Sequence, residues 1–153
     1  MTKEDKELLL KDICARIPYG VKILHEGWNY EWDDELSTVE RVVGIDENFI
    51  YTKVIDTHTS EEYRDDRHPI STFDDKLFLR PMSSMTEEEK RHISKMMCLR
   101  TYDDGVVHDM TYPVYTPYYV MEDCLSYLRS IHVDYSGLIE KGLALVAPEG
   151  MYQ

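Results

Sequence analysis

The side chains best suited to chemistry gather between residues 58 and 68. Imidazole and carboxylate groups bind zinc, manganese or iron, and a loop could fold them inward around one ion. No pair has the i, i+4 spacing of a helical zinc motif, and Arg64 and Arg67 lie in the same stretch. We therefore expect a charged, solvated loop and no metal, with a metal-dependent hydrolase as the alternative. The candidate ligands for that alternative are His58, Asp65, Asp66 and His68.

Aromatic side chains form a second candidate site. Trp28, Tyr30 and Trp32 alternate along the chain, so in an extended segment all three share a face. A second crowded segment contains Tyr112, Tyr115 and Tyr118. Tyr and Trp are enriched in binding hot spots because they bury a large area at low entropic cost. The alternative is that these rings cover the sheet and pack its rim.

The net charge of -13 narrows the choice of partner. Residues 18–36 contain five acids and one Lys, and residues 101–125 contain five acids and neither Lys nor Arg. An acidic surface repels phosphate backbones, which argues against direct nucleic-acid binding. It suits a partner protein with a basic surface, and a nucleic-acid mimic is a further alternative.

Size and composition favour one cytoplasmic domain spanning residues 1–153. No apolar run approaches the roughly 20 residues of a membrane helix, so we expect no membrane partner. The three cysteines are odd in number and widely spaced, which favours reduced thiols. No Gly-rich phosphate loop is present in the sequence, and we expect no cofactor.

The first half of the chain predicts a helix followed by strands. Thr2 and Asp5 form a capping pair, and Pro18 and Gly20 end the helix. Residues 21–26 predict a short strand. Two β-branched runs, 38–45 and 49–55, predict a hairpin whose turn ends in Asn48, a residue that tolerates the left-handed conformation. Residues 56–76 read as a loop with room for a short strand, and residues 77–79 predict a strand near a sheet edge because Pro81 follows.

The second half predicts helices. A capping box at Thr86 starts one, residues 121–131 fit another, and Ser136 caps a last segment over 137–145. His132 follows the middle helix, where a histidine complements the helix C-terminus. The expected fold class is α+β, with an N-terminal helix, a small, curved antiparallel sheet and two to three C-terminal helices. An SH3-like barrel is one version of this sheet.

Three sequence blocks carry a resemblance to a known family. They are LLLKDICARIPYGVK (residues 8–22), LRPMSSMTEEE (79–89) and YSGLIEKGLA (135–144), the last followed by APEGMY (147–152). The chain resembles a family of small acidic proteins from anaerobic gut bacteria and their prophages and mobile elements. The resemblance implies a single cytoplasmic domain with an accessory, host-modulating role. Together with the aromatic segments, it leads us to expect a non-enzymatic protein-interaction domain.

Overall fold

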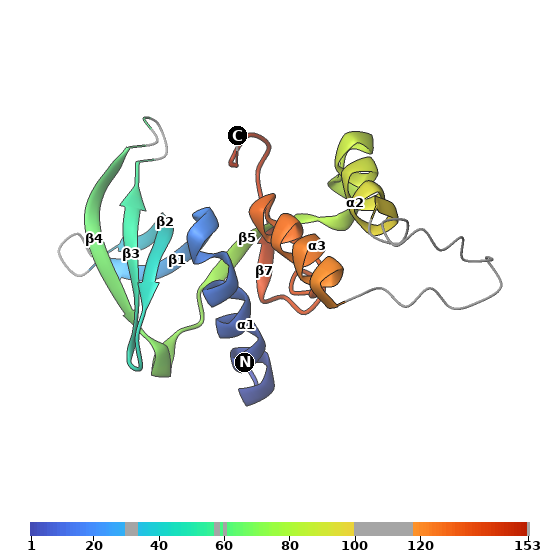
Figure 1. Ribbon diagram of the computed structural model, residues 1–153. Helices are drawn as coiled ribbons and strands as arrows, with labels where there is room; N and C mark the ends of the chain where they lie inside the picture. The colour runs from blue at the N-terminus through green and yellow to red at the C-terminus, as the bar shows by residue number, and fades with distance from the viewer. Residues whose placement is uncertain (30–33, 57–58, 60, 100–117, 153) are drawn as a thin grey trace.

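The computed structural model describes residues 1–29, 34–56, 59, 61–99 and 118–152, with side chains omitted at 28–29, 34–36 and 98–99. The described residues form three helices and a seven-stranded, mostly antiparallel sheet, which confirms the predicted α+β class (Figure 1). The sheet is open rather than closed into a barrel, because its end strands do not pair with each other in the described part of the chain. No helix among these residues is long and apolar enough to cross a membrane.

Helix α1 (Lys3–Arg16) forms as the sequence predicts. The Thr2 hydroxyl accepts a hydrogen bond from the Asp5 amide, and the Asp5 carboxylate accepts one from the Thr2 amide. The 3-10 turn η1 (Ile17–Tyr19) follows, and Gly20 ends it with φ +72°. Leu9 and Ile13 bury one side of α1 in the main hydrophobic core.

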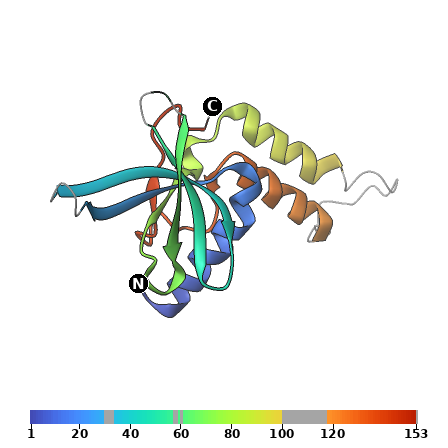
Figure 2. The same ribbon diagram turned by 90° about the vertical axis from the view of Figure 1, so that its left-hand side faces the viewer.

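Four antiparallel strands follow as a meander: β1 (Lys22–Asn29), β2 (Asp34–Ile45), β3 (Phe49–Ile55) and β4 (Glu62–Pro69). In Figure 2, β1 and β2 extend together beyond the rest of the sheet. The predicted 46–48 turn between β2 and β3 is confirmed, but for another reason. The Asp46 carboxylate accepts hydrogen bonds from the amides of Asn48 and Phe49, and Asn48 is not left-handed.

Strand β5 (Lys76–Pro81) lies inside the sheet, so the prediction of an edge position was wrong. It follows the 3-10 turn η2 (Ile70–Thr72) and pairs with β1. Two short strands from the end of the chain, β6 (Val133–Asp134) and β7 (Ala144–Val146), pair with it in parallel. Pro81 ends the strand as predicted, but both sides of β5 pair with segments that are distant in sequence. The residues around Pro81 alone do not reveal this pairing.

The described residues of the C-terminal half form two helices. Helix α2 (Glu87–Leu99) follows the 3-10 turn η3 (Met82–Ser84) and has the predicted capping box between Thr86 and Glu89. Helix α3 (Tyr118–Ser130) overlaps the predicted 121–131 segment, and a second core cluster of Met85, Leu128 and Val133 lies beneath it.

The helix predicted over 137–145 does not form. The Asp134 carboxylate, rather than Ser136, accepts hydrogen bonds from the amides of Leu138 and Ile139 and holds a turn. Gly137 and Gly142, both at φ +71°, let the chain reverse there and enter β7.

The C-terminal segment closes a gap where β1 and β5 diverge. The Tyr152 hydroxyl accepts a hydrogen bond from the Lys22 amide at 3.0 Å and donates one to the Phe78 carbonyl at 2.8 Å. The Tyr152 ring stacks on His132 with ring centroids 3.6 Å apart. A side chain thus replaces backbone pairing at this point of the sheet.

Candidate metal centre

The inner face of the curved sheet changes from aliphatic to polar along its strands. Ile23, Val42 and Ile50 are fully buried in the main core. Alternate residues of a strand share a face, so the residues beyond these three extend the same surface. That extension includes the polar side chains of His25, Glu40, Thr52 and His68, with Val54 beside Glu40.

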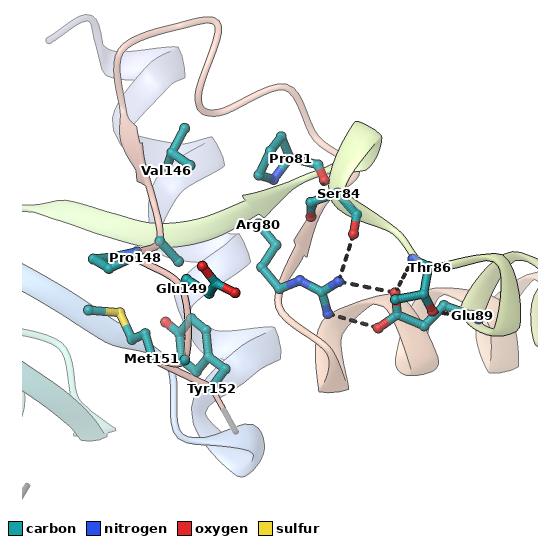
Figure 3. Close-up of a pocket in the computed structure, with 12 residues that line it drawn as sticks. Arg80, Pro81, Ser84, Thr86, Glu89, Val146, Pro148, Glu149, Met151 and Tyr152 are labelled. Carbon is teal, nitrogen blue, oxygen red and sulfur yellow. Dashed lines mark hydrogen bonds and ion pairs between the residues drawn. The ribbon is translucent and has the colours of Figure 1, made fainter.

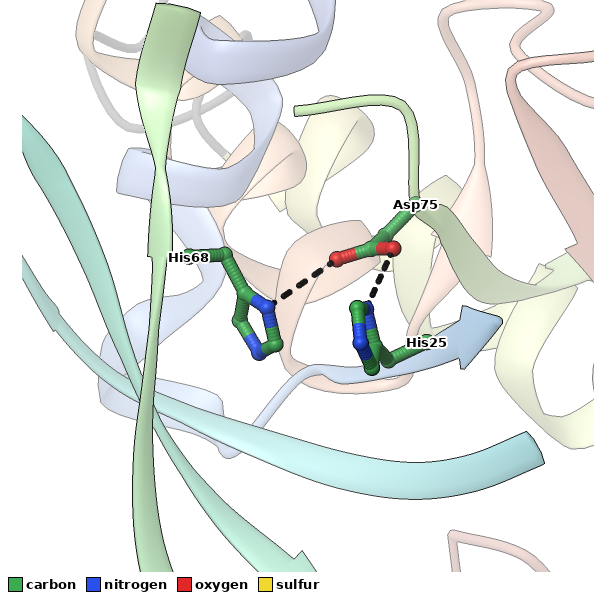
Figure 4. Close-up of side chains that lie close together, drawn as sticks. All are labelled: His25, His68 and Asp75. Atoms are coloured by element: carbon green, nitrogen blue, oxygen red, sulfur yellow. Dashed lines mark hydrogen bonds and ion pairs between the residues drawn. The ribbon is translucent and has the colours of Figure 1, made fainter. Parts of the chain in front are cut away.

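Two of these side chains meet Asp75, which lies just before β5 (Figure 4). Nδ1 of His25 lies 2.9 Å from Oδ1 of Asp75, and Nδ1 of His68 lies 3.8 Å from Oδ2. One ligand atom from each of the three residues can be chosen so that all lie within 4.8 Å of one another. The cluster therefore joins β1, β4 and the segment before β5.

Glu40 supports His68 from the opposite side. Its Oε2 lies 2.6 Å from Nε2 of His68 and accepts a hydrogen bond from the Thr52 hydroxyl at 2.5 Å, while Oε1 accepts one from Thr38 at 2.8 Å. Burial raises the pKa of Glu40, but these hydrogen bonds outweigh burial and lower it to about 2. A fully buried carboxylate is thus kept charged beside the imidazole.

His25 is the most accessible member of the cluster, with 27% of its side chain exposed. Its hydrogen bond to Asp75 raises its pKa; burial opposes this, and the charges of Asp75, Glu40 and Asp66 reinforce it. Gly27 lies two residues on along the same face. A Cβ at Gly27 would lie 3.0 Å from Nε2 of His25, so the ring occupies space that any other residue would take.

These donors fit a divalent transition-metal ion. Zinc binds imidazole nitrogen and carboxylate oxygen at about 2.0–2.2 Å, which places tetrahedral ligand atoms about 3.4 Å apart. The two Nδ1 atoms lie 2.9 and 3.8 Å from different oxygens of Asp75, and one ligand atom from each of the three residues lies within 4.8 Å of the others, so small side-chain shifts would bring them to that spacing. Two histidines and one carboxylate leave a fourth position for water, as in catalytic zinc sites.

The predicted metal loop contributes one residue to this cluster. His68 is brought into it, and His58 lies outside the described residues. The side chain of Asp65 is 84% exposed and pairs with Lys53, and Asp66 pairs with Arg64. Residues 62–69 form strand β4, a longer strand than the short one that the sequence left room for, and its alternation turns Asp65 outward.

His25 and Asp75 were not among the predicted site residues. No short motif joins the ligands, because they come from three separate segments. Two signals were available: Glu40 interrupts the β-branched run from Thr38 to Val43, and His25 follows Ile23 at strand spacing. A charge inside a buried strand indicates a buried partner.

The predicted aromatic face lies largely outside the part of the chain that is described. This applies to Tyr30, Trp32, Tyr112 and Tyr115, and to the side chain of Trp28. Tyr118 begins α3 and is 81% exposed. The interaction face and the nucleic-acid mimic therefore stay predictions.

A cavity of about 550 Å³ lies between β5, the start of α2 and the C-terminal segment (Figure 3). Its charged groups are largely engaged with one another. Arg80 donates to both carboxylate oxygens of Glu89 and to the carbonyls of Ser84 and Ile131. This arginine ties η3, α2 and the end of α3 together, so its role in the cavity wall is structural.

The sequence predicts that His132 complements the C-terminus of α3, but its ring carries no positive charge there. It is 3% exposed. Burial, followed by the charge of Arg16, lowers its pKa to about 4, so the ring is neutral at pH 7. The neighbouring Asp134 is engaged by backbone amides, which leaves no acid–base pair at this position.

Comparison with known proteins adds no relative to this picture. A scan against protein-family models, a search of curated proteins and a search of solved structures each found no match for this chain. The resemblance to small acidic proteins of gut bacteria and their prophages stays a prediction.

Proposed function

We propose that the protein binds a divalent transition-metal ion, zinc foremost, through His25, His68 and Asp75. The observation that carries the proposal is the convergence of three ligand atoms within 4.8 Å from separate segments of the chain. The proposal departs from the expectation that the protein has no metal, and it moves the alternative metal site from the 58–68 loop to the inner face of the sheet.

The local charge supports a cation at this position. The carboxylates of Asp75, Glu40 and Asp66 all act on His25 electrostatically. Asp66 is balanced by Arg64 at the surface, whereas Asp75 and Glu40 are buried beside two imidazoles. Buried carboxylates are stable when they are paired or coordinate a metal, and a divalent ion supplies that compensation.

The ligand chemistry favours zinc among the available ions. The three ligands offer nitrogen and oxygen and no thiolate, which suits zinc or cobalt better than softer ions. Calcium requires six to eight oxygen ligands, which this set cannot supply.

The test is a titration of the protein, prepared without a polyhistidine tag, with Zn²⁺ and with Co²⁺ as a spectroscopic probe. We expect one ion per chain, and His68→Gln should weaken binding by more than about 100-fold, because loss of an outer partner alone costs 10–100-fold. A zinc concentration of 100 times Kd should stabilise the fold by about 2.7 kcal/mol.

The matched control is His92→Gln, which replaces an exposed histidine on α2 that lies beside Tyr127. This variant should bind zinc as the wild type does. Equal zinc binding by wild type and His68→Gln, or no stoichiometric binding by the wild type, would overturn the proposal.

A further inference from the structure

Glu40 determines how the His68 ring can present itself to an ion. The side chain is fully buried on β2, and hydroxyl groups of Thr38 and Thr52 donate to its two oxygens. A carboxylate held by donors on both oxygens is stabilised in its charged form, which only accepts hydrogen bonds. The 2.6 Å contact with Nε2 of His68 therefore requires the proton to be on that nitrogen.

The other ring nitrogen then has a free lone pair. Nδ1 of His68 faces Oδ2 of Asp75 at 3.8 Å, which is beyond hydrogen-bond distance. When His68 is neutral and carries its proton on Nε2, its Nδ1 and the Oδ2 of Asp75 are both hydrogen-bond acceptors. The two atoms therefore repel each other unless a cation lies between them. The arrangement prepares Nδ1, rather than Nε2, as the ligand atom.

We propose that Glu40 is a positioning residue that holds His68 in the Nε2–H tautomer and thereby directs Nδ1 toward the metal. This inference rests on the proposed metal site and assigns its outer shell. Histidine ligands commonly donate their second N–H to a carboxylate, which fixes the ring and raises its basicity. Thr38 and Thr52 orient the carboxylate in turn.

The first experiment measures the tautomer in metal-free, ¹⁵N-histidine-labelled wild-type protein at pH 8, with the His68 signals assigned by comparison with His68→Gln. We expect the long-range ¹H–¹⁵N pattern of a ring protonated on Nε2 alone. A proton on Nδ1, whether alone or together with one on Nε2, would overturn the inference. This measurement does not depend on the folding of a Glu40 variant.

The second experiment measures zinc affinity and the tautomer in Glu40→Gln. The amide can donate as well as accept, so we expect a mixed tautomer and 10–100-fold weaker zinc binding. Glu62→Gln is the matched control, because Glu62 pairs with Arg41 on the same sheet, away from the cluster. It should leave both readouts unchanged.

The outcomes separate the two proposals. Zinc binding by the wild type with unchanged affinity and tautomer in Glu40→Gln overturns the role of Glu40 alone. Absence of zinc binding by the wild type overturns the metal site and this inference with it. Should Glu40→Gln not fold, Thr38→Val keeps the charge and removes one donor; a several-fold loss of zinc affinity is expected, and unchanged affinity counts against the inference.

Discussion

Gly27 shows how a single residue shapes the cluster. Its backbone is ordinary β-strand, so the need for glycine there does not come from a left-handed conformation. The need comes from space, because an added Cβ would lie 3.0 Å from Nε2 and 3.7 Å from Cε1 of His25. The position of this proposed metal ligand thus depends on the absence of a side chain at residue 27.

We expect Gly27→Ala to displace the His25 ring and weaken zinc binding by roughly tenfold, at the low end of the cost of an outer-shell change. Isothermal titration with zinc measures the effect. Gly44→Ala is the matched control, because a Cβ there would make only an ordinary 3.9 Å contact with Tyr51. Equal affinities for the two variants would show that the ring does not need this space.

Of the three residues in the cluster, the sequence predicted one. His68 was a predicted ligand, and it does join the cluster. Asp75 was missed because nothing in the sequence around it differs from an ordinary acidic loop; its side chain becomes buried only when β4 and β1 curve toward it. Ligands that meet through tertiary structure leave no spacing to detect.

Among the secondary-structure elements, α1 is fixed at its end by a buried ion pair. Arg16 and Asp12, four residues apart, are both buried, and Nε of Arg16 lies 2.6 Å from the carboxylate. Arg16 also donates to the Val133 carbonyl in β6 and lies over the Tyr135 ring. One side chain therefore joins the first helix to the strand that follows α3.

We expect Asp12→Ala to destabilise the protein by about 3–5 kcal/mol, because it leaves a buried guanidinium without its counter-charge. The double variant Asp12→Leu with Arg16→Met should cost less than the single one, since no charge remains buried. Urea unfolding measures both. Glu7→Ala, which removes an exposed pair with Lys3, should change little. A double variant less stable than Asp12→Ala would contradict this account.

Elements with local signals were predicted correctly, and those held by distant contacts were not. In each of the caps of α1 and α2 and the 46–48 turn, the residues that bond to each other are at most three positions apart in sequence. Strand β4 has no apolar alternation, because its buried position carries His68 of the polar cluster. The 137–145 segment has helical spacing, but Asp134 and the pairing of β7 with β5 decide its structure.

At the scale of the whole molecule, the C-terminal segment connects the sheet with the residues that follow α3. His132 has φ 56°, and its ring is buried against Tyr152. Lys22 also lies over the Tyr152 ring, with its ammonium 5.5 Å from the ring centroid. A neutral histidine is compatible with the nearby positive charges of Arg16, Lys22 and Arg80, whereas a protonated one adds an uncompensated charge to them.

This neutral histidine makes the stability of the fold depend on pH. Its pKa is about 4 when folded and 6.5 when unperturbed, so below pH 6.5 the unfolded chain gains a proton that the folded chain does not. Stability therefore falls between pH 6.5 and about 4, by up to about 3 kcal/mol.

In His132→Phe, which keeps the ring stack, this part of the acid sensitivity should disappear. Urea unfolding between pH 4.5 and 7.5 gives the comparison. His92→Phe, an exposed position, should retain the wild-type pH dependence. Parallel stability curves for wild type and His132→Phe would exclude His132 as the source.

The Tyr152 hydroxyl bonds to two residues that are synthesised earlier than Tyr152 itself. Lys22 and Phe78, the residues it bridges, leave the ribosome well before it does. Until then the Lys22 amide and the Phe78 carbonyl must be hydrated. The nascent chain can form the β1–β4 meander but cannot close the gap between β1 and β5. The contact can therefore form only once a side chain 74 residues beyond Phe78 has been made.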